Sequence, residues 1–268
     1  MKHAILFGLN YSYTTDARLR GCINDVRNME QVLKNTFQFD DVRSFTDDTT
    51  LGRRHTSGRG MLAEINNLAS RSWSEKIDLA WIHFSGHGCG IPDIGAQKDE
   101  SDGRDECLVP SDFKRAGVVP DDFIKECLRK FSPKTRVIFI ADCCHSGTIG
   151  DLKYCYVGKQ KTIENRASSS KACDAKIILI SGCKDDQTSA DAFNVNRMRK
   201  FSGAMTSCLI HSFNSLGENP GVFALIDTLR ANLRQKRFTQ IPQLTTSFEL
   251  QDDERLFPKH QKTAFLND

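Results

Sequence analysis

The chain has 268 residues, of which 39% are hydrophobic and 26% are charged, a composition typical of a globular protein. Lys and Arg exceed Asp and Glu by only 37 − 34 = 3 and are scattered, so charge gives no support to a nucleic-acid-binding protein. No apolar stretch approaches the ~20 residues needed to cross a bilayer, and the amino terminus lacks a signal-peptide pattern. We therefore expect a cytoplasmic protein that binds neither nucleic acid nor a membrane.

The ten cysteines are spread along the chain, and none forms a C-x-x-C pair. A zinc ribbon or a thioredoxin-type redox site therefore has no support in the sequence. Because the amino terminus carries no secretory pattern, we expect free thiols in a reducing compartment. Most of these cysteines should behave as small buried hydrophobic side chains.

Short β-branched runs alternate with helical patterns along the chain. The pattern predicts strands at 3–11, 42–47, 78–86, 135–143, 175–183 and 242–250. It predicts helices at 22–37, 58–72, 120–131, 202–216 and 221–236. This order indicates an α/β fold with a mostly parallel central β-sheet and helices on both faces.

Two polar stretches interrupt the alternation of strands and helices. Residues 87–119 are rich in Gly, Asp and Glu and predict a long loop, and residues 151–174 predict a polar linker. We expect a single domain over 1–268, in which the linker joins a large region at about 1–150 to a small region at 175–268.

Cysteine and histidine occur at the ends of two predicted strands, each flanked by glycine. The third strand ends in HFSGHG (83–88) and the fourth ends in DCCHSG (142–147). Sites in open α/β sheets form beyond the carboxyl ends of the strands, so these ends should lie side by side. A nearby histidine can remove the thiol proton and create a nucleophilic thiolate. His87 precedes Cys144 by 144 − 87 = 57 residues, close to the ~50-residue spacing of caspase-type enzymes.

Seven short motifs occur in the order found in one group of proteases. They are GCINDV (21–26), HFSGHG (83–88), DGRDECLVPSD (102–112), DCCHSG (142–147), SGCKDDQTSAD (181–191), GAMT (203–206) and PQLTTS (242–247). In these motifs the sequence resembles the metacaspases, which are caspase-like cysteine proteases. The resemblance covers nearly the whole chain and implies a caspase-like sandwich of helices around the central sheet.

The resemblance also implies the catalytic roles. The nucleophile is the cysteine directly before His-Ser-Gly, which is Cys144, and the base is His87. Its neighbour Cys143 is interpreted as a buried thiol at the strand end. By resemblance to caspases, the backbone N–H groups of Gly88 and Cys144 are the expected oxyanion donors.

Metacaspases cut after Arg or Lys, which requires an acidic pocket. The matching positions put Asp25 and Asp142 at the base of the pocket, with Ser85 lining it and Cys22 close by. An ordinary alternative for Asp25 is an exposed acid at a helix amino terminus. Asp142 is harder to explain in that way, because it follows a buried run in which an unpaired carboxylate would be costly.

A calcium site is a second implication of the resemblance. The matching positions are Asp102, Asp121, Asp122 and Asp151, whose carboxylates suit a hard cation. The alternative for the acid-rich run at 99–106 is an ordinary solvated loop. A bound Ca²⁺ would order the active site and would take no part in the chemistry.

Form and processing also follow from the resemblance. The chain looks like a minimal, prodomain-less metacaspase of the first type, expected to be a monomer that acts on proteins or peptides with Arg or Lys before the cut. Mobile polar linkers are prone to cleavage. The possible self-cleavage sites in this linker are Lys159, Lys161, Arg166 and Lys171.

The predicted function is that of a calcium-dependent cysteine endopeptidase, and three alternatives stay open. The first is a caspase-like pseudoenzyme that acts as an interaction module. The second is a redox sensor built on Cys143 and Cys144, although adjacent cysteines form strained disulfides. The third is a related cysteine protease with another specificity, which the pair Asp25 and Asp142 disfavours.

Overall fold

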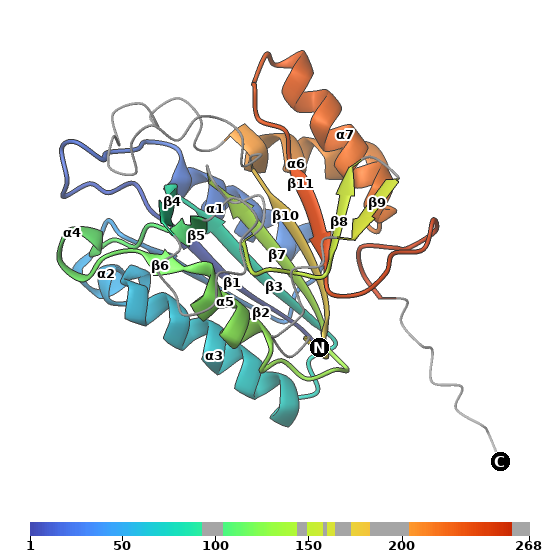
Figure 1. Cartoon of the computed structure of the whole chain (residues 1–268), viewed down its shortest axis with the longest axis horizontal. Helices are drawn as coiled ribbons and strands as arrows, with labels where there is room; N and C mark the ends of the chain where they lie inside the picture. The colour runs from blue at the N-terminus through green and yellow to red at the C-terminus, as the bar shows by residue number, and fades with distance from the viewer. Residues whose placement is uncertain (93–103, 144–148, 158–159, 164–172, 183–203, 259–268) are drawn as a thin grey trace.

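A parallel β-sheet lies at the centre of the protein (Figure 1). The structure is a computed structural model and describes residues 1–92, 104–143, 149–157, 160–163, 173–182 and 204–258. The parallel strands, in spatial order, are β2 (Asp41–Thr46), β1 (Lys2–Gly8), β3 (Leu79–Ser85), β7 (Arg136–Asp142) and β10 (Lys176–Ser181). All five correspond to predicted strands, which confirms the mostly parallel sheet.

Three antiparallel strands continue the sheet beyond β10. They are β11 (Gln243–Thr246), β8 (Tyr154–Val157) and β9 (Gln160–Ile163), in that order. The last two lie inside the stretch 151–174, where the sequence predicted a polar linker and no strand. The physical reason is Tyr156, which is buried against Phe223 and carries β8 into the core.

Helices cover both faces of the main sheet (Figure 1). One face carries α1 (Cys22–Gln31) with its π-helical continuation (Val32–Thr36), α6 (Ala204–Leu216) and α7 (Val222–Gln235). The other face carries α3 (Gly58–Ser74) and α5 (Asp121–Leu128), with α2 (Thr50–Thr56) beside α3. Alternate strand residues enter the two cores, as Trp81 and Ile82 do from β3.

A small antiparallel sheet forms where the sequence predicted a long loop at 87–119. Its strands are β4 (Gly88–Pro92), β5 (Arg104–Leu108) and β6 (Val119–Pro120), and the short helix α4 (Phe113–Ala116) precedes β6. Cys89 of β4 lies opposite Cys107 of β5 in the strand register, and both are buried thiols. Their small apolar side chains pack the small sheet against the core.

The register of the parallel strands decides which side chains meet at their carboxyl ends. Ser85 at the end of β3 pairs with Asp142 at the end of β7, and Ala141 pairs with Ser181 at the end of β10. The three strands therefore end at the same level. Whatever follows them in the chain leaves the sheet along one shared edge.

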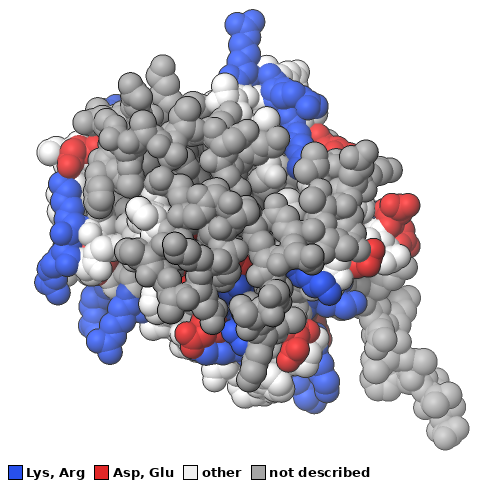
Figure 2. All heavy atoms as spheres, viewed as in Figure 1, with Lys and Arg blue, Asp and Glu red and all other residues white. Residues whose placement is uncertain are grey.

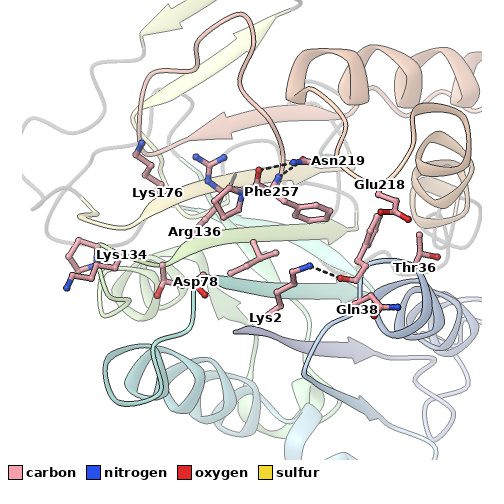
Figure 3. Close-up of a pocket in the computed structure, with 15 residues that line it drawn as sticks. Lys2, Thr36, Gln38, Asp78, Lys134, Arg136, Lys176, Glu218, Asn219 and Phe257 are labelled. Carbon is pink, nitrogen blue, oxygen red and sulfur yellow. Dashed lines mark hydrogen bonds between the residues drawn. The ribbon is translucent and has the colours of Figure 1, made fainter. Parts of the chain in front are cut away.

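A cavity of about 790 Å³ lies at the opposite edge of the sheet (Figure 3). It is lined by the first residues of three strands, Lys2, Arg136 and Lys176, together with Asp78 and Glu218. This cavity is at the amino ends of the strands, whereas the predicted Cys–His site is at the carboxyl ends. It is therefore separate from the candidate active site.

Charged side chains of both signs are interspersed on the face shown in Figure 2. The described Lys and Arg side chains project around its edge, and described Asp and Glu side chains lie between them. Among the described helices, none combines the length and apolar character needed to span a bilayer.

Candidate active site

His87 is buried just beyond the carboxyl end of β3. Its Nε2 atom lies 2.8 Å from the carbonyl oxygen of Ala17. Because a carbonyl oxygen only accepts hydrogen bonds, Nε2 donates, and Nδ1 carries the lone pair of the neutral ring. Burial lowers the pKa of His87, and the hydrogen bond to Ala17 opposes that shift. The ring is therefore neutral at neutral pH and has a basic nitrogen at Nδ1.

Tyr11 fixes both the backbone and the ring of His87. The backbone N–H of His87 donates to the Tyr11 hydroxyl over 2.9 Å, and that hydroxyl donates to the carbonyl of Val109 over 2.7 Å. The two rings stack at a tilt, with centroids 4.8 Å apart. The backbone of Tyr11 has φ +50°, and Asp47 accepts the N–H groups of Asn10 and Tyr11. Sequence reasoning missed Tyr11 and Asp47. They precede His87 by 76 and 40 residues, respectively (87 − 11 = 76 and 87 − 47 = 40).

Gly86 is required by the close packing around Tyr11. A Cβ atom at this position would lie 2.8 Å from the Tyr11 hydroxyl and 2.7 Å from the ring of Phe84. Both neighbours are buried and cannot move aside. The glycine before His87 therefore lets the backbone approach the tyrosine that holds it.

The predicted nucleophile follows β7. Cys144 lies outside the described residues, which reach Cys143 at this point. Ser85 and Asp142 pair in register, and the N–H of Gly86 donates to the carbonyl of Asp142 over 3.3 Å. The chain thus enters His87 and Cys144 from adjacent strand ends, each two residues beyond the paired positions. Cys143 is buried, as its interpretation as a strand-end thiol predicts.

Gly88, the second predicted oxyanion donor, begins β4 directly after His87. It pairs with Leu108 of β5 in the small sheet. The position lies beside the histidine, and its role as an oxyanion donor stays a prediction.

The predicted substrate-binding residues come together at the ends of β3 and β7. The Ser85 hydroxyl donates to Asp25 Oδ2 over 3.0 Å. Burial, and then the charge of Asp142, raise the pKa of Asp25 to about 7, while the Ser85 hydrogen bond opposes the shift. Asp25 is only 7% exposed, which excludes the alternative of an exposed helix-terminal acid. Cys22 is also buried, one turn earlier on α1.

Asp142 is held by the first turn of α6. Its Oδ2 atom accepts hydrogen bonds from the backbone N–H of Thr206 at 2.8 Å and from the Thr206 hydroxyl at 2.7 Å. Its Oδ1 atom is buried and has no partner among the described residues. Burial raises the pKa of Asp142 to about 6, and the bonds from Thr206 and from the backbone N–H of Met205 oppose that shift. The motif GAMT contains Thr206, yet sequence reasoning gave this residue no role.

Two of the four predicted calcium ligands form a second buried acidic cluster. Asp121 is buried, the side chain of Asp151 is 5% exposed, and Lys125 Nζ lies 3.2 Å from Asp151 Oδ2. One oxygen of each aspartate has no partner among the described residues. Burial raises the pKa of Asp121 to about 8, with further contributions from the charges of Asp151, Asp122 and Asp105.

The other two predicted ligands contribute less to this picture. Asp122 is exposed on the first turn of α5, and Asp102 lies outside the described residues. Within the described ranges, no three His, Cys, Asp or Glu side chains are arranged to hold a metal ion. Sequence reasoning missed Lys125, which supplies the cation of the cluster.

The predicted self-cleavage sites are divided. Lys161 lies in β9, so its backbone is in a strand and not in the mobile linker that the sequence predicted. Lys159, Arg166 and Lys171 lie outside the described residues.

Comparison with known proteins connects this arrangement to one family. A family model described as the metacaspase peptidase C14 domain matches residues 2–153. The chain is 32% identical over 260 residues to Metacaspase-3 of Trypanosoma cruzi, covering 91% of this chain and 70% of that protein. It is 33% identical over 297 residues to Metacaspase-1 of Yarrowia lipolytica, covering 92% of this chain and 61% of that protein.

Solved structures agree at the level of the fold. Caspase-1 of Spodoptera frugiperda has a TM-score of 0.55 at 13% identity, covering 91% of this chain and 85% of that chain. A crystal structure of a Geobacter sulfurreducens protein has a TM-score of 0.61 at 22% identity, covering 94% and 95%. The fold is therefore the caspase-like α/β sandwich, and the chain belongs to the metacaspase family of cysteine-type peptidases.

Proposed function

We propose that this protein is a cysteine endopeptidase in which Cys144 is the nucleophile and His87 is the general base. The observation that carries the proposal is the state of His87. Its Nε2 proton is held by Ala17, so Nδ1 is the nitrogen available to a thiol. The neighbouring strand end leads directly to Cys144.

The proposed reaction uses His87 and Cys144 in turn. His87 Nδ1 takes the proton of the Cys144 thiol, and the sulfur attacks the substrate carbonyl carbon. The imidazolium then gives that proton to the leaving amine as the peptide bond breaks, leaving a thioester. Water, deprotonated by the same nitrogen, hydrolyses the thioester and releases the second product. The Ala17 carbonyl faces the positive charge of the imidazolium and favours it.

A pair of cysteine variants tests this assignment. Cys144→Ala should abolish cleavage of peptide substrates, whereas Cys143→Ala should keep most of it, because Cys143 is a buried thiol. Alkylation by iodoacetamide, located by mass spectrometry, should modify Cys144 first. Wild-type protein that alkylates slowly at Cys144 and cleaves no peptide would support the pseudoenzyme alternative.

The acidic pair supports specificity for Arg or Lys before the cut. Asp25 and Asp142 are both buried, and the charge of Asp142 raises the pKa of Asp25. An arginine or lysine side chain would supply the missing positive charge and favour ionisation of both. We therefore expect cleavage of fluorogenic peptides that end in Arg or Lys, and none of peptides that end in Asp. Efficient cleavage after Asp would refute the acidic pocket.

Calcium binding is proposed for the second acidic cluster. Asp121 and Asp151 each have one oxygen without a partner among the described residues, which fits a cation with oxygen ligands, and exposed Asp122 follows Asp121 in the chain. These residues, with Asp102, would hold Ca²⁺, which would supply positive charge and order the segment after the nucleophile. Lys125 already supplies positive charge to Asp151 through an ion pair, so Ca²⁺ has to compete with Lys125 for this carboxylate. Affinity should be weak, about 10⁻⁴–10⁻³ M.

Calcium binding can be measured without catalysis. Isothermal titration of the Cys144→Ala protein should show one weak Ca²⁺ site, which Asp151→Asn removes. An unchanged titration for Asp151→Asn would leave the acid-rich run as a solvated loop.

A further inference from the structure

A one-way chain of hydrogen bonds ends at Asp142. The Thr206 hydroxyl has one proton, and it lies 2.7 Å from the carboxylate oxygen Oδ2 of Asp142, which accepts it. Toward His83 the same hydroxyl must therefore act as the acceptor. His83 Nε2 lies 3.0 Å away and donates to it. The series of hydrogen bonds runs from His83 through Thr206 to Asp142.

The state of His83 agrees with this direction. The side chain is fully buried on β3, and burial lowers the pKa of His83 to about 3, so the ring is neutral. A neutral ring has one N–H, and the bond to Thr206 places it on Nε2. The other nitrogen, Nδ1, has no partner among the described residues. The single ring N–H of His83 is therefore donated to Thr206, and Nδ1 is the buried atom left without a hydrogen bond among the described residues.

The hydrogen bonds also show which of the two carboxylates, Asp25 or Asp142, is ionised. Asp142 accepts two hydrogen bonds from Thr206, one of them from the positive amino end of α6. Asp25 accepts one hydrogen bond, from Ser85. Donors that point at a carboxylate stabilise its ionised form, so Asp142 is the ionised member of the pair and Asp25 carries the shared proton.

We propose that Thr206 and His83 are positioning residues for substrate specificity: they hold one oxygen of Asp142 and leave Oδ1 to accept the basic side chain of the substrate. The final torsion of an aspartate side chain is broad, so an unrestrained carboxylate would turn freely. With Oδ2 fixed, Oδ1 is the buried acceptor that remains without a partner among the described residues. This inference rests on the proposed specificity for Arg and Lys.

The test compares variants that remove one link with variants that keep it. Thr206→Val has the same shape without the hydroxyl, and it should raise KM for an Arg peptide about tenfold or more while kcat changes less than about twofold. Thr206→Ser should restore KM. His83→Leu should raise KM severalfold, and His83→Gln, whose amide can donate to Thr206, should recover most of it. The exposed His211→Gln on α6 is the matched control and should behave as wild type.

Two readouts separate positioning from a general structural role. Carbon-13 NMR of the Asp142 carboxyl should show a higher pKa in Thr206→Val, because a donor to the ionised form is gone. The rate of Cys144 alkylation should stay unchanged. An unchanged KM and an unchanged Asp142 pKa in Thr206→Val would overturn the inference, as would a loss of kcat together with slower alkylation.

Failure of the proposed specificity gives a different result. In that case the wild-type protein cleaves no Arg or Lys peptide, which overturns the specificity role. The NMR comparison of wild type with Thr206→Val still decides whether the chain of hydrogen bonds sets the charge of Asp142.

Discussion

Two buried acidic pairs lie on opposite faces of the sheet and are neutralised in different ways. Within the described part of the chain, the hydrogen-bond donors to Asp25 and Asp142 are neutral: Ser85 for Asp25, and Thr206 and the backbone N–H of Met205 for Asp142. Asp121 and Asp151 have a resident cation in Lys125. Under the proposed specificity, the first pair would receive its positive charge from the substrate side chain. In the second, an entering cation must compete with one already present.

Removal of the resident cation should have the largest effect. Lys125→Met leaves Asp151 and Asp121 buried together without a counter-charge, which should lower the free energy of unfolding by about 3–5 kcal/mol. The measurement is urea unfolding of the Cys144→Ala protein in chelator. The exposed Lys130→Met should change stability by less than about 0.5 kcal/mol. Equal stability of the two variants would contradict the role of Lys125.

Charge removal from the first pair should act on activity. Asp142→Asn keeps the shape of the side chain but loses the ionised carboxylate. The fall in kcat/KM for Arg peptides should correspond to a loss of about 2–5 kcal/mol of transition-state binding. Asp25→Asn should lose less, because Asp25 carries the shared proton. Steady-state kinetics on the two variants checks this order, and a larger loss in Asp25→Asn would reverse the assignment of charge.

The first pair should also make stability depend on pH. The pKa of Asp25 is about 7 in the folded protein, above its usual range near 4. The folded state therefore binds more protons than the unfolded state between these values, and stability falls as pH rises from about 4 to about 7. Above that range the contribution is constant. Unfolding free energies at pH 5 and pH 8 should differ less in Asp25→Asn than in wild type; an equal difference would place the effect elsewhere.

Self-cleavage should show the smallest effect. Fragments ending at Lys159, Lys161, Arg166 or Lys171 are expected after incubation with Ca²⁺, as judged by mass spectrometry. Cleavage at Lys161 should be slowest, because β9 must leave the sheet before its backbone can enter an active site. Fast cleavage at Lys161, ahead of the other three, would contradict the strand assignment.

The central strands and main helices could be predicted because each has a long, regular pattern. The strand β7 is a continuous buried run, and α3 has apolar residues at helical spacing. The strands of the small sheet and the pair β8 and β9 have two to five residues each, with mixed polar and apolar side chains. These short strands form because they pair with strands distant in the sequence, and a local sequence pattern does not predict such pairing.

The sequence could nominate candidate residues from short motifs, but it could not show which distant residues contact them. His87, Asp25 and Asp142 each sit in a short recognisable stretch. Thr206 reaches Asp142 from 64 positions away, and Tyr11 reaches His87 from 76 positions away. Lys125 looks like an ordinary residue of an amphipathic helix until Asp151 is placed beside it.

The contact between α6 and β7 has a consequence for biosynthesis. Asp142 leaves the ribosome long before Thr206, since 64 residues separate them, and at ~5–20 residues per second this delay lasts about 3–13 s. Until α6 docks, no N–H or hydroxyl of Thr206 reaches the carboxylate. A nascent chain that already contains both His87 and Cys144 thus still lacks the ordered Asp142. The hydrogen bonds that hold Asp142 therefore form only after part of the last third of the chain has been made.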